Sequence, residues 1–179
     1  MRKGLYFYIM AQSQNSSSLL DTTALKDLTQ ARIAIVCTEW NDAIINELVS
    51  GAEKVVNELG ATILKKIVVP GCVEIPFACK QLWDHYNQPA AHKPEAIIAF
   101  GTVIRGGTPH FDFVCKSVTE GITQLNLTLP IPIIFGILTL DNETQAWERL
   151  GGPHGHKGEE AAIAALKMIQ NSRALYINP

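Results

Sequence analysis

Hydrophobic residues fall into two alternating patterns from about residue 31 onward. Short apolar runs, rich in β-branched residues, predict four strands at 32–37, 62–70, 95–104 and 132–139, and those at 32–37 and 95–104 should be buried. Helical spacing, or helix-start and helix-stop signals, predict five helices at 41–60, 74–86, 109–127, 141–151 and 157–172. In the first of these helices, Asn41 is the predicted N-cap and Gly60 the predicted stop.

Strands that alternate with helices predict an α/β fold of the three-layer, flavodoxin-like kind. Its four-stranded sheet should be parallel, with helices on both faces. Residues 31–179 then form one domain, and residues 1–30 form a polar, serine-rich N-terminal arm. Ligands of such folds bind beyond the carboxyl ends of the strands. The loops at 38–41, 70–74, 102–110 and 139–141 are therefore where chemistry is expected.

Composition narrows the function classes. The formal net charge is −2 and no basic tract occurs, which argues against a nucleic-acid partner. Only 18% of residues are charged, which favours an oligomer that hides part of its surface. Four cysteines without a C-x-x-C pair indicate buried, reduced thiols in a cytoplasmic protein. No stretch approaches the length of a membrane helix, and Met10 would serve as a start as well as Met1.

The loop after the third strand carries the strongest chemical signal. Thr108 followed by Pro109 predicts a helix start. Gly106 and Gly107 let the backbone approach a ligand, and the helix N-terminus favours an anion such as phosphate. His110 then lies beside that anion, where it can donate or accept a proton. The alternative is a structural turn with a solvent-exposed histidine.

Other loop residues each allow two interpretations. Arg105 either contacts an anion or pairs with a carboxylate and braces the loop. Trp40 either stacks on a flat heterocycle or packs in the protein. Glu74 either hydrogen-bonds a polyhydroxylated ligand or stabilises the start of its helix. Arg149 either serves a helix C-terminus or reaches a phosphate across a subunit boundary.

The histidine-rich stretch "HGHKG" at 154–158 does not predict a metal site. His154 and His156 have no Cys, Asp or third His at a usual ligand spacing. Lys157, beside Gly158, is a candidate contact for a carbonyl group or an anion.

Four motifs in order carry a family resemblance. They are "IAIVCTEWND", "VPGCVEIP", "AFGTVIRGGTPHFDFV", and "PIIFGILTLDNETQAWERLGG" running into "HKGEEAAIAALKM". The chain resembles the 6,7-dimethyl-8-ribityllumazine synthase family over about residues 31 to 170. The resemblance implies a transferase of riboflavin biosynthesis, which condenses 5-amino-6-(D-ribitylamino)uracil with 3,4-dihydroxy-2-butanone 4-phosphate and releases phosphate and water. It implies no cofactor and no metal.

For the uracil, the resemblance implies that Trp40 stacks on the ring and that the ribityl chain is held by Cys72, Val73 and Glu74. It also implies that backbone groups of three residues contact the heterocycle: Thr102, Val103 and Ile104. Family members often carry an aromatic residue in place of Val73 and an asparagine in place of His156, so packing over the ribityl chain and hydrogen bonding before Lys157 are expected to differ.

For the butanone phosphate, the resemblance implies binding by Gly107 and Thr108 and proton transfer by His110. It further implies that Phe135 of a neighbouring subunit covers the ring and that Arg149 of the same neighbour holds the phosphate. With Arg149 in that role, Arg105 is expected to be a brace.

The resemblance also implies an assembly. The family forms pentamers, and many members pack twelve pentamers into an icosahedral shell of about sixty chains. The short turn "LGGPHGHKG" favours the shell, and riboflavin synthase is an implied partner. The N-terminal arm is expected to add an edge strand to a neighbouring sheet. The alternative function is a catalytically silent homologue that forms shells or binds flavin.

Overall fold

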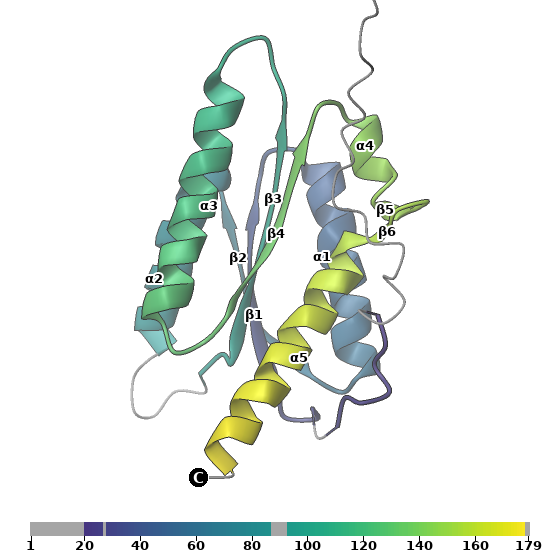
Figure 1. The fold of residues 1–179 in the computed structure, drawn as a ribbon, viewed down its shortest axis with the longest axis vertical. Coiled ribbons are helices and arrows are strands. Elements are labelled where there is room, and N and C mark those ends of the chain that lie inside the picture. Colours follow the sequence, from purple (N-terminus) through teal and green to yellow (C-terminus); the bar gives the residue numbers. More distant parts are fainter. Residues whose placement is uncertain (1–19, 27, 87–92, 178–179) are drawn as a thin grey trace, which may run out of the picture.

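Four parallel strands form the central sheet, in the order β2-β1-β3-β4 (Figure 1). The computed structural model describes residues 20–26, 28–86 and 93–177. The strands of the sheet are β1 (Arg32–Thr38), β2 (Thr62–Val69), β3 (Ala96–Ile104) and β4 (Ile133–Leu140). The helices are α1 (Asp42–Glu58), α2 (Ile75–Tyr86), α3 (His110–Thr128), α4 (Thr144–Trp147) and α5 (Lys157–Ile177), with a 3₁₀ turn, η2, at Cys72–Glu74. The predicted four-stranded parallel α/β sheet is confirmed.

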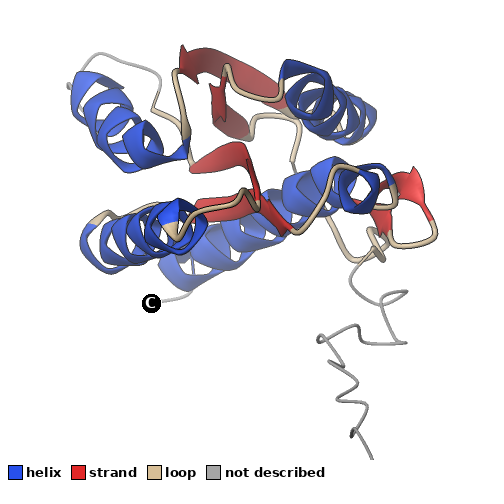
Figure 2. Ribbon diagram, turned by 90° about the horizontal axis from the view of Figure 1, so that it is seen from above, coloured by secondary structure: helices blue, strands red, loops and turns tan. Residues whose placement is uncertain are grey.

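Two pairs of helices cover the two faces of the sheet. Helices α1 and α5 pack on one face, and α2 and α3 pack on the other, so the strands stack between two pairs of helices (Figure 2). Successive residues of β1 alternate between the two cores: Ile33 and Ile35 face α1 and α5, whereas Ala34 and Val36 face α2 and α3. Every residue of β1 after Arg32 is buried, as the continuous apolar run predicted.

The two outer strands are only partly buried. β2 carries Lys65 and Lys66; four of its eight residues are exposed, and Val69 is the buried one. β4 lies at the opposite edge and exposes Phe135. The prediction of a buried strand therefore holds for β1 and β3, while β2 and β4 each have one edge to which no other described strand pairs.

The predicted helix at 141–151 is wrong for most of its length. Helix α4 has four residues, and the chain then forms a small antiparallel hairpin, β5 (Leu150–Gly152) with β6 (Gly155–His156). Gly151 and Gly155 adopt φ angles of 98° and 75°, which a helix does not contain and which glycine adopts readily. Gly151 and Gly155 therefore belong to a turn between α4 and α5.

Of the two predicted N-caps, Asn41 is confirmed in position and Thr108 is wrong. Asn41 is the N-cap of α1, but its side chain makes no capping hydrogen bond. Thr108 is not the N-cap of α3: that position is Pro109, the helix begins at His110, and the Thr108 hydroxyl only accepts a long hydrogen bond of 3.4 Å from the His110 N–H. The helix still begins within one residue of the predicted position.

The described end of the N-terminal arm packs on its own chain. Leu28 is buried in the core beside α1 and α5. Lys26 N–H donates to the side-chain Oε1 of Gln170 (2.9 Å), and the side-chain Nε2 of Gln170 donates to the Ala24 backbone carbonyl (3.2 Å). The predicted edge strand falls largely on residues 1–19, which lie outside the described residues. Within the described ranges, none of the helices has the length and apolar character needed to cross a membrane.

Candidate active site

The loops after β1, β2 and β3 meet at one end of the sheet, as the parallel topology predicted. Hydrogen bonds join them: Glu39 N–H donates to the Val69 carbonyl (2.8 Å), and the Asn41 side-chain amide donates to the Thr102 carbonyl (3.2 Å). Residues 38–42, 70–74 and 102–110 therefore lie together at the carboxyl edge of the sheet, and their exposed part is called the carboxyl-edge surface below.

Trp40 projects from this surface into solvent. Its side chain is 74% exposed, so it does not pack in the core of its own chain. Its backbone is nevertheless held, because its N–H donates to the Pro70 carbonyl (3.4 Å) and its carbonyl accepts from the Thr38 hydroxyl (3.2 Å). An exposed ring on a fixed backbone is a ready platform for a flat heterocycle.

The turn at 71–74 presents backbone and carboxylate groups beside Trp40. Glu74 accepts a hydrogen bond from the Gly71 N–H (3.0 Å), which accounts for one carboxylate oxygen and supports the structural interpretation of this residue. Val73 is exposed. Cys72 is buried against Gly101, where a Cβ on the glycine would lie only 2.5 Å from the Cys72 sulfur. The close approach of η2 to β3 thus requires a glycine at position 101.

The glycine loop is open on the surface of the chain. Residues Arg105 to His110 are all exposed. A Cβ added to Gly106 or to Gly107 would meet no atom within 4 Å, and neither residue has a positive φ. Nothing in the chain's own packing or backbone therefore demands glycine here. A requirement for glycine at these positions would come from a ligand or a neighbouring chain.

Arg105 is a brace, as expected. Its Nε donates to Asp141 Oδ1 (2.9 Å), its Nη1 lies 3.4 Å from Asp112 Oδ1, and its guanidinium stacks 4.0 Å from the centre of the Phe111 ring. Asp141 lies beyond β4 and Asp112 in the first turn of α3. The arginine thus joins the loops that follow β3 and β4.

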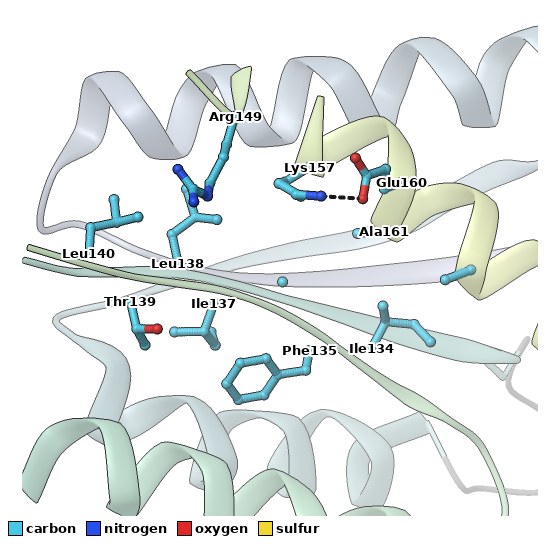
Figure 3. Close-up of a pocket in the computed structure, with 12 residues that line it drawn as sticks. Ile134, Phe135, Ile137, Leu138, Thr139, Leu140, Arg149, Lys157, Glu160 and Ala161 are labelled. Carbon is cyan, nitrogen blue, oxygen red and sulfur yellow. Dashed lines mark hydrogen bonds and ion pairs between the residues drawn. The ribbon is translucent and has the colours of Figure 1, made fainter. Parts of the chain in front are cut away.

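Phe135 and Arg149 lie elsewhere, around the edge strand β4 (Figure 3). They line a pocket of about 340 Å³, with Phe135 on the α2–α3 side of the strand and Arg149 on the other side with Lys157. Arg149 is 16% exposed and donates to the Gln145 carbonyl (2.9 Å). The Lys157 ammonium donates to the Glu160 carboxylate over 2.6 Å. The i, i+3 spacing of the two residues could have predicted this ion pair, although it was not among the expectations from the sequence.

Within one chain, the carboxyl-edge surface around Trp40 does not meet Phe135 and Arg149 at the β4 edge. Phe135 pairs with Ala99, three residues before Thr102 on β3, whereas Trp40 follows β1 on the other side of β3. The strands β1 and β4 are separated by two inter-strand spacings, about 10 Å. The carboxyl-edge surface and the β4 edge are thus two separate parts of a candidate site.

Among the described residues, no group of three or more His, Cys, Asp or Glu side chains could hold a metal ion. His156 instead fills a space beside α1, with its Nε2 3.4 Å from Glu47 Oε1. Its ring lies against Gly51, where a side chain would collide with it.

The Cys72 thiol should be inert towards alkylating reagents. Burial raises the pKa of the Cys72 thiol to about 12, and burial likewise raises the pKa of Cys79 to about 12. At pH 8 only about one Cys72 side chain in ten thousand is then the reactive thiolate. We expect iodoacetamide to leave both cysteines unmodified in the folded protein and to label them in denaturant, as read by peptide mass mapping. Rapid labelling of Cys72 in the folded protein would contradict this expectation.

Comparisons with known proteins find similarity over nearly all of the α/β domain. The family model described as 6,7-dimethyl-8-ribityllumazine synthase matches residues 30–173. Proteins with that name are similar in Parabacteroides distasonis (41% identity over 165 residues, 91% of this chain and 99% of the relative) and Porphyromonas gingivalis (43% over 161 residues, 89% and 96%). A further one, from Bacteroides fragilis, is 44% identical over 141 residues, 77% of this chain and 94% of the relative.

Proposed function

Because the chain belongs to the 6,7-dimethyl-8-ribityllumazine synthase family, we propose that it condenses 5-amino-6-(D-ribitylamino)uracil with 3,4-dihydroxy-2-butanone 4-phosphate. The products are 6,7-dimethyl-8-ribityllumazine, phosphate and water, in riboflavin biosynthesis. The observation that carries the proposal is the similarity over nearly the whole chain to relatives of that name. Nothing favours the alternative of a silent homologue.

The uracil is proposed to lie on the carboxyl-edge surface. Its ring stacks on Trp40, whose exposed side chain and held backbone suit that role. The backbone of Thr102, Val103 and Ile104 offers hydrogen-bonding groups to the heterocycle. The ribityl chain lies along Cys72, Val73 and Glu74, with the second oxygen of Glu74 as a hydroxyl acceptor.

The butanone phosphate is proposed to bind at the start of α3. Backbone N–H groups near Gly107 and Thr108 and the positive end of the helix dipole suit its phosphate. The amine of the uracil attacks the ketone and forms an imine with loss of one water, and phosphate is eliminated from the butanone carbon chain. The ribitylamino nitrogen adds to the remaining carbonyl carbon, and the ring closes with loss of a second water. His110, exposed beside the open glycine loop, moves the protons. Donors placed where phosphate leaves stabilise the charge that develops there.

A second chain is proposed to complete the site. Phe135 of a neighbour covers the ring and Arg149 of that neighbour holds the phosphate. The support is geometric, since both residues lie at the unpaired edge of β4, away from Trp40. The assembly is then a homo-oligomer whose active sites lie between subunits. A pentamer or a sixty-chain shell, association with riboflavin synthase, and a cytoplasmic location stay predictions.

The proposed function is tested by mixing the purified protein with the two substrates and following lumazine absorbance. We expect product well above the slow uncatalysed background. Formation at the background rate would refute the enzyme and favour the silent homologue. Tight binding of a different sugar phosphate, without response to the uracil, would indicate another phosphosugar enzyme of the same fold.

Replacing His110 should slow the reaction without abolishing it. We expect His110→Ala to lower kcat by about a hundredfold, the low end of what general acid–base catalysis contributes, because holding two reactive partners together supplies the rest. His85→Ala, which removes an exposed histidine at the far end of α2, is the matched control and should keep the wild-type rate. Complete loss of turnover in His110→Ala would mean that proton transfer dominates catalysis.

A further inference from the structure

Asn41 has an unusual backbone for its position. Its φ and ψ angles are 62° and 45°, and it is the one non-glycine residue with a positive φ among residues 20–26, 28–86 and 93–177. This left-handed conformation is unfavourable for L-residues, although asparagine tolerates it better than most. Such outliers persist where the surrounding structure holds them, and they cluster at functional sites.

The side chain of Asn41 does not stabilise its own helix. An N-cap asparagine ordinarily accepts a hydrogen bond from an N–H in the first turn. Here the Asn41 side chain makes no such bond, while its backbone carbonyl accepts from the Ile45 N–H (3.0 Å) in the ordinary helical way. The need to begin α1 therefore does not explain why an asparagine stands at this position.

The amide of Asn41 instead reaches the third strand. Its Nδ2 donates to the Thr102 carbonyl over 3.2 Å, across 61 positions of sequence. The pairing of β1 with β3 ends at Cys37 and Phe100, so this bond joins the two segments beyond their last paired residues. Thr102 is only 4% exposed, and its carbonyl is thus held in a largely dry environment where a lost partner is costly.

The neighbouring residue, Trp40, depends on the same loop. Its N–H and carbonyl are held by Pro70 and the Thr38 hydroxyl, and the left-handed turn at Asn41 follows it directly. The turn sets the direction in which the chain leaves Trp40. The amide bond then sets the distance between this loop and Thr102. One residue therefore links the exposed ring to the backbone at the end of β3.

We propose that Asn41 is a positioning residue for the uracil substrate: it holds the Trp40 loop against the end of β3 through its amide bond to the Thr102 carbonyl. The inference rests on the proposed function, because the two groups that it holds are those assigned to the heterocycle. Asn41 itself touches neither reacting atom. Its contribution is geometric, since a ring displaced by about 1 Å loses much of its productive stacking.

The test compares two variants at position 41. Asn41→Gly keeps the left-handed backbone and removes the amide. Asn41→Asp keeps the shape and places a carboxylate against the Thr102 carbonyl. We expect both to raise the KM for ribitylaminouracil by about tenfold or more, with the KM for the butanone phosphate within about twofold of wild type. Circular dichroism and thermal melting check that both variants fold.

Asn126 offers a matched control. Its amide donates to the Ile133 carbonyl (2.9 Å) and its oxygen accepts from the Ile133 N–H (2.7 Å), at the opposite end of the sheet. Asn126→Asp loses an equivalent side chain to backbone bond. It should lower the melting temperature without separating the two KM values.

A double variant tests whether Asn41 acts through Trp40. In a Trp40→Ala background, Asn41→Gly should change the KM for the uracil by less than about threefold, because the ring that it positions is gone. The inference would be overturned if the rise in the KM for the uracil in the double variant equalled the product of the rises in the two single variants. An unchanged KM for the uracil in both single variants, or an equal rise for both substrates, would also overturn it. Failure of the wild-type protein to make lumazine would instead overturn the proposed function.

Discussion

Arg149→Ala is expected to weaken the butanone phosphate far more than the uracil. A guanidinium bonded to phosphate contributes about 1.5–3 kcal/mol, so the KM for the phosphate substrate should rise about tenfold to a hundredfold. The KM for the uracil should change by less than about threefold, because Arg149 is proposed to contact only the phosphate. Steady-state kinetics with each substrate varied in turn measures both values.

Two controls make this prediction specific. Arg149→Lys keeps the charge but loses the planar fork, and we expect it to recover part of the affinity. Arg173→Ala removes an arginine that forms two bonds to Glu95, 2.8 and 2.9 Å long, at the opposite end of the sheet, and it should leave both KM values unchanged. An equal loss for both substrates in Arg149→Ala would refute the phosphate role.

Gly158→Ala is expected to destabilise the fold strongly. Gly158 lies in the first turn of α5, directly against the backbone of Leu48 in α1. A Cβ there would collide with the Leu48 carbonyl oxygen and lie 2.8 Å from its carbonyl carbon, and backbone atoms cannot swing aside as a side chain can. We expect a loss of about 3 kcal/mol in the free energy of unfolding, measured in urea at fixed protein concentration, and a larger loss for Gly158→Val.

The sign of this effect separates packing from helix propensity. By propensity alone, alanine in a helix is about 1 kcal/mol better than glycine, so Gly158→Ala would stabilise. Gly106→Ala is the control, because a Cβ at Gly106 meets no atom within 4 Å. Its free energy of unfolding should stay within about 0.5 kcal/mol of wild type. A stabilised Gly158→Ala variant would show that α1 and α5 can separate at no cost.

Local sequence patterns predicted well those strands and helices whose bounds depend only on nearby residues. The strand at 95–104 and the helix at 41–60 were expected within about two residues of where β3 and α1 lie. The helix at 141–151 was wrong because its polar and apolar residues suited a helix while Gly151 and Gly155 imposed a turn. Secondary-structure signals depend on residues that are neighbours in sequence. They fail where the positive φ angles of glycines determine the path of the backbone.

The candidate site divides in the same way. Its carboxyl-edge half was predictable, because parallel strands place their following loops at one edge whatever the side chains do. The exposure of Trp40 was not predictable, since a tryptophan in a loop is equally compatible with packing. Nor was the contact of Asn41 with Thr102, which its ordinary position as an N-cap concealed.

The sequence by itself determined the four strands of the parallel sheet, the helices other than the one expected at 141–151, the edge of the sheet where the candidate loops lie, and the family. Each of these is encoded in local periodicity or in short motifs. Only the tertiary structure decided which glycine is required by packing, as at Gly158, and which faces open solvent, as at Gly106. It also decided that Arg105 bridges Asp112 and Asp141. These features depend on distances between segments far apart in the chain, which close packing of the whole fold sets and no local pattern encodes.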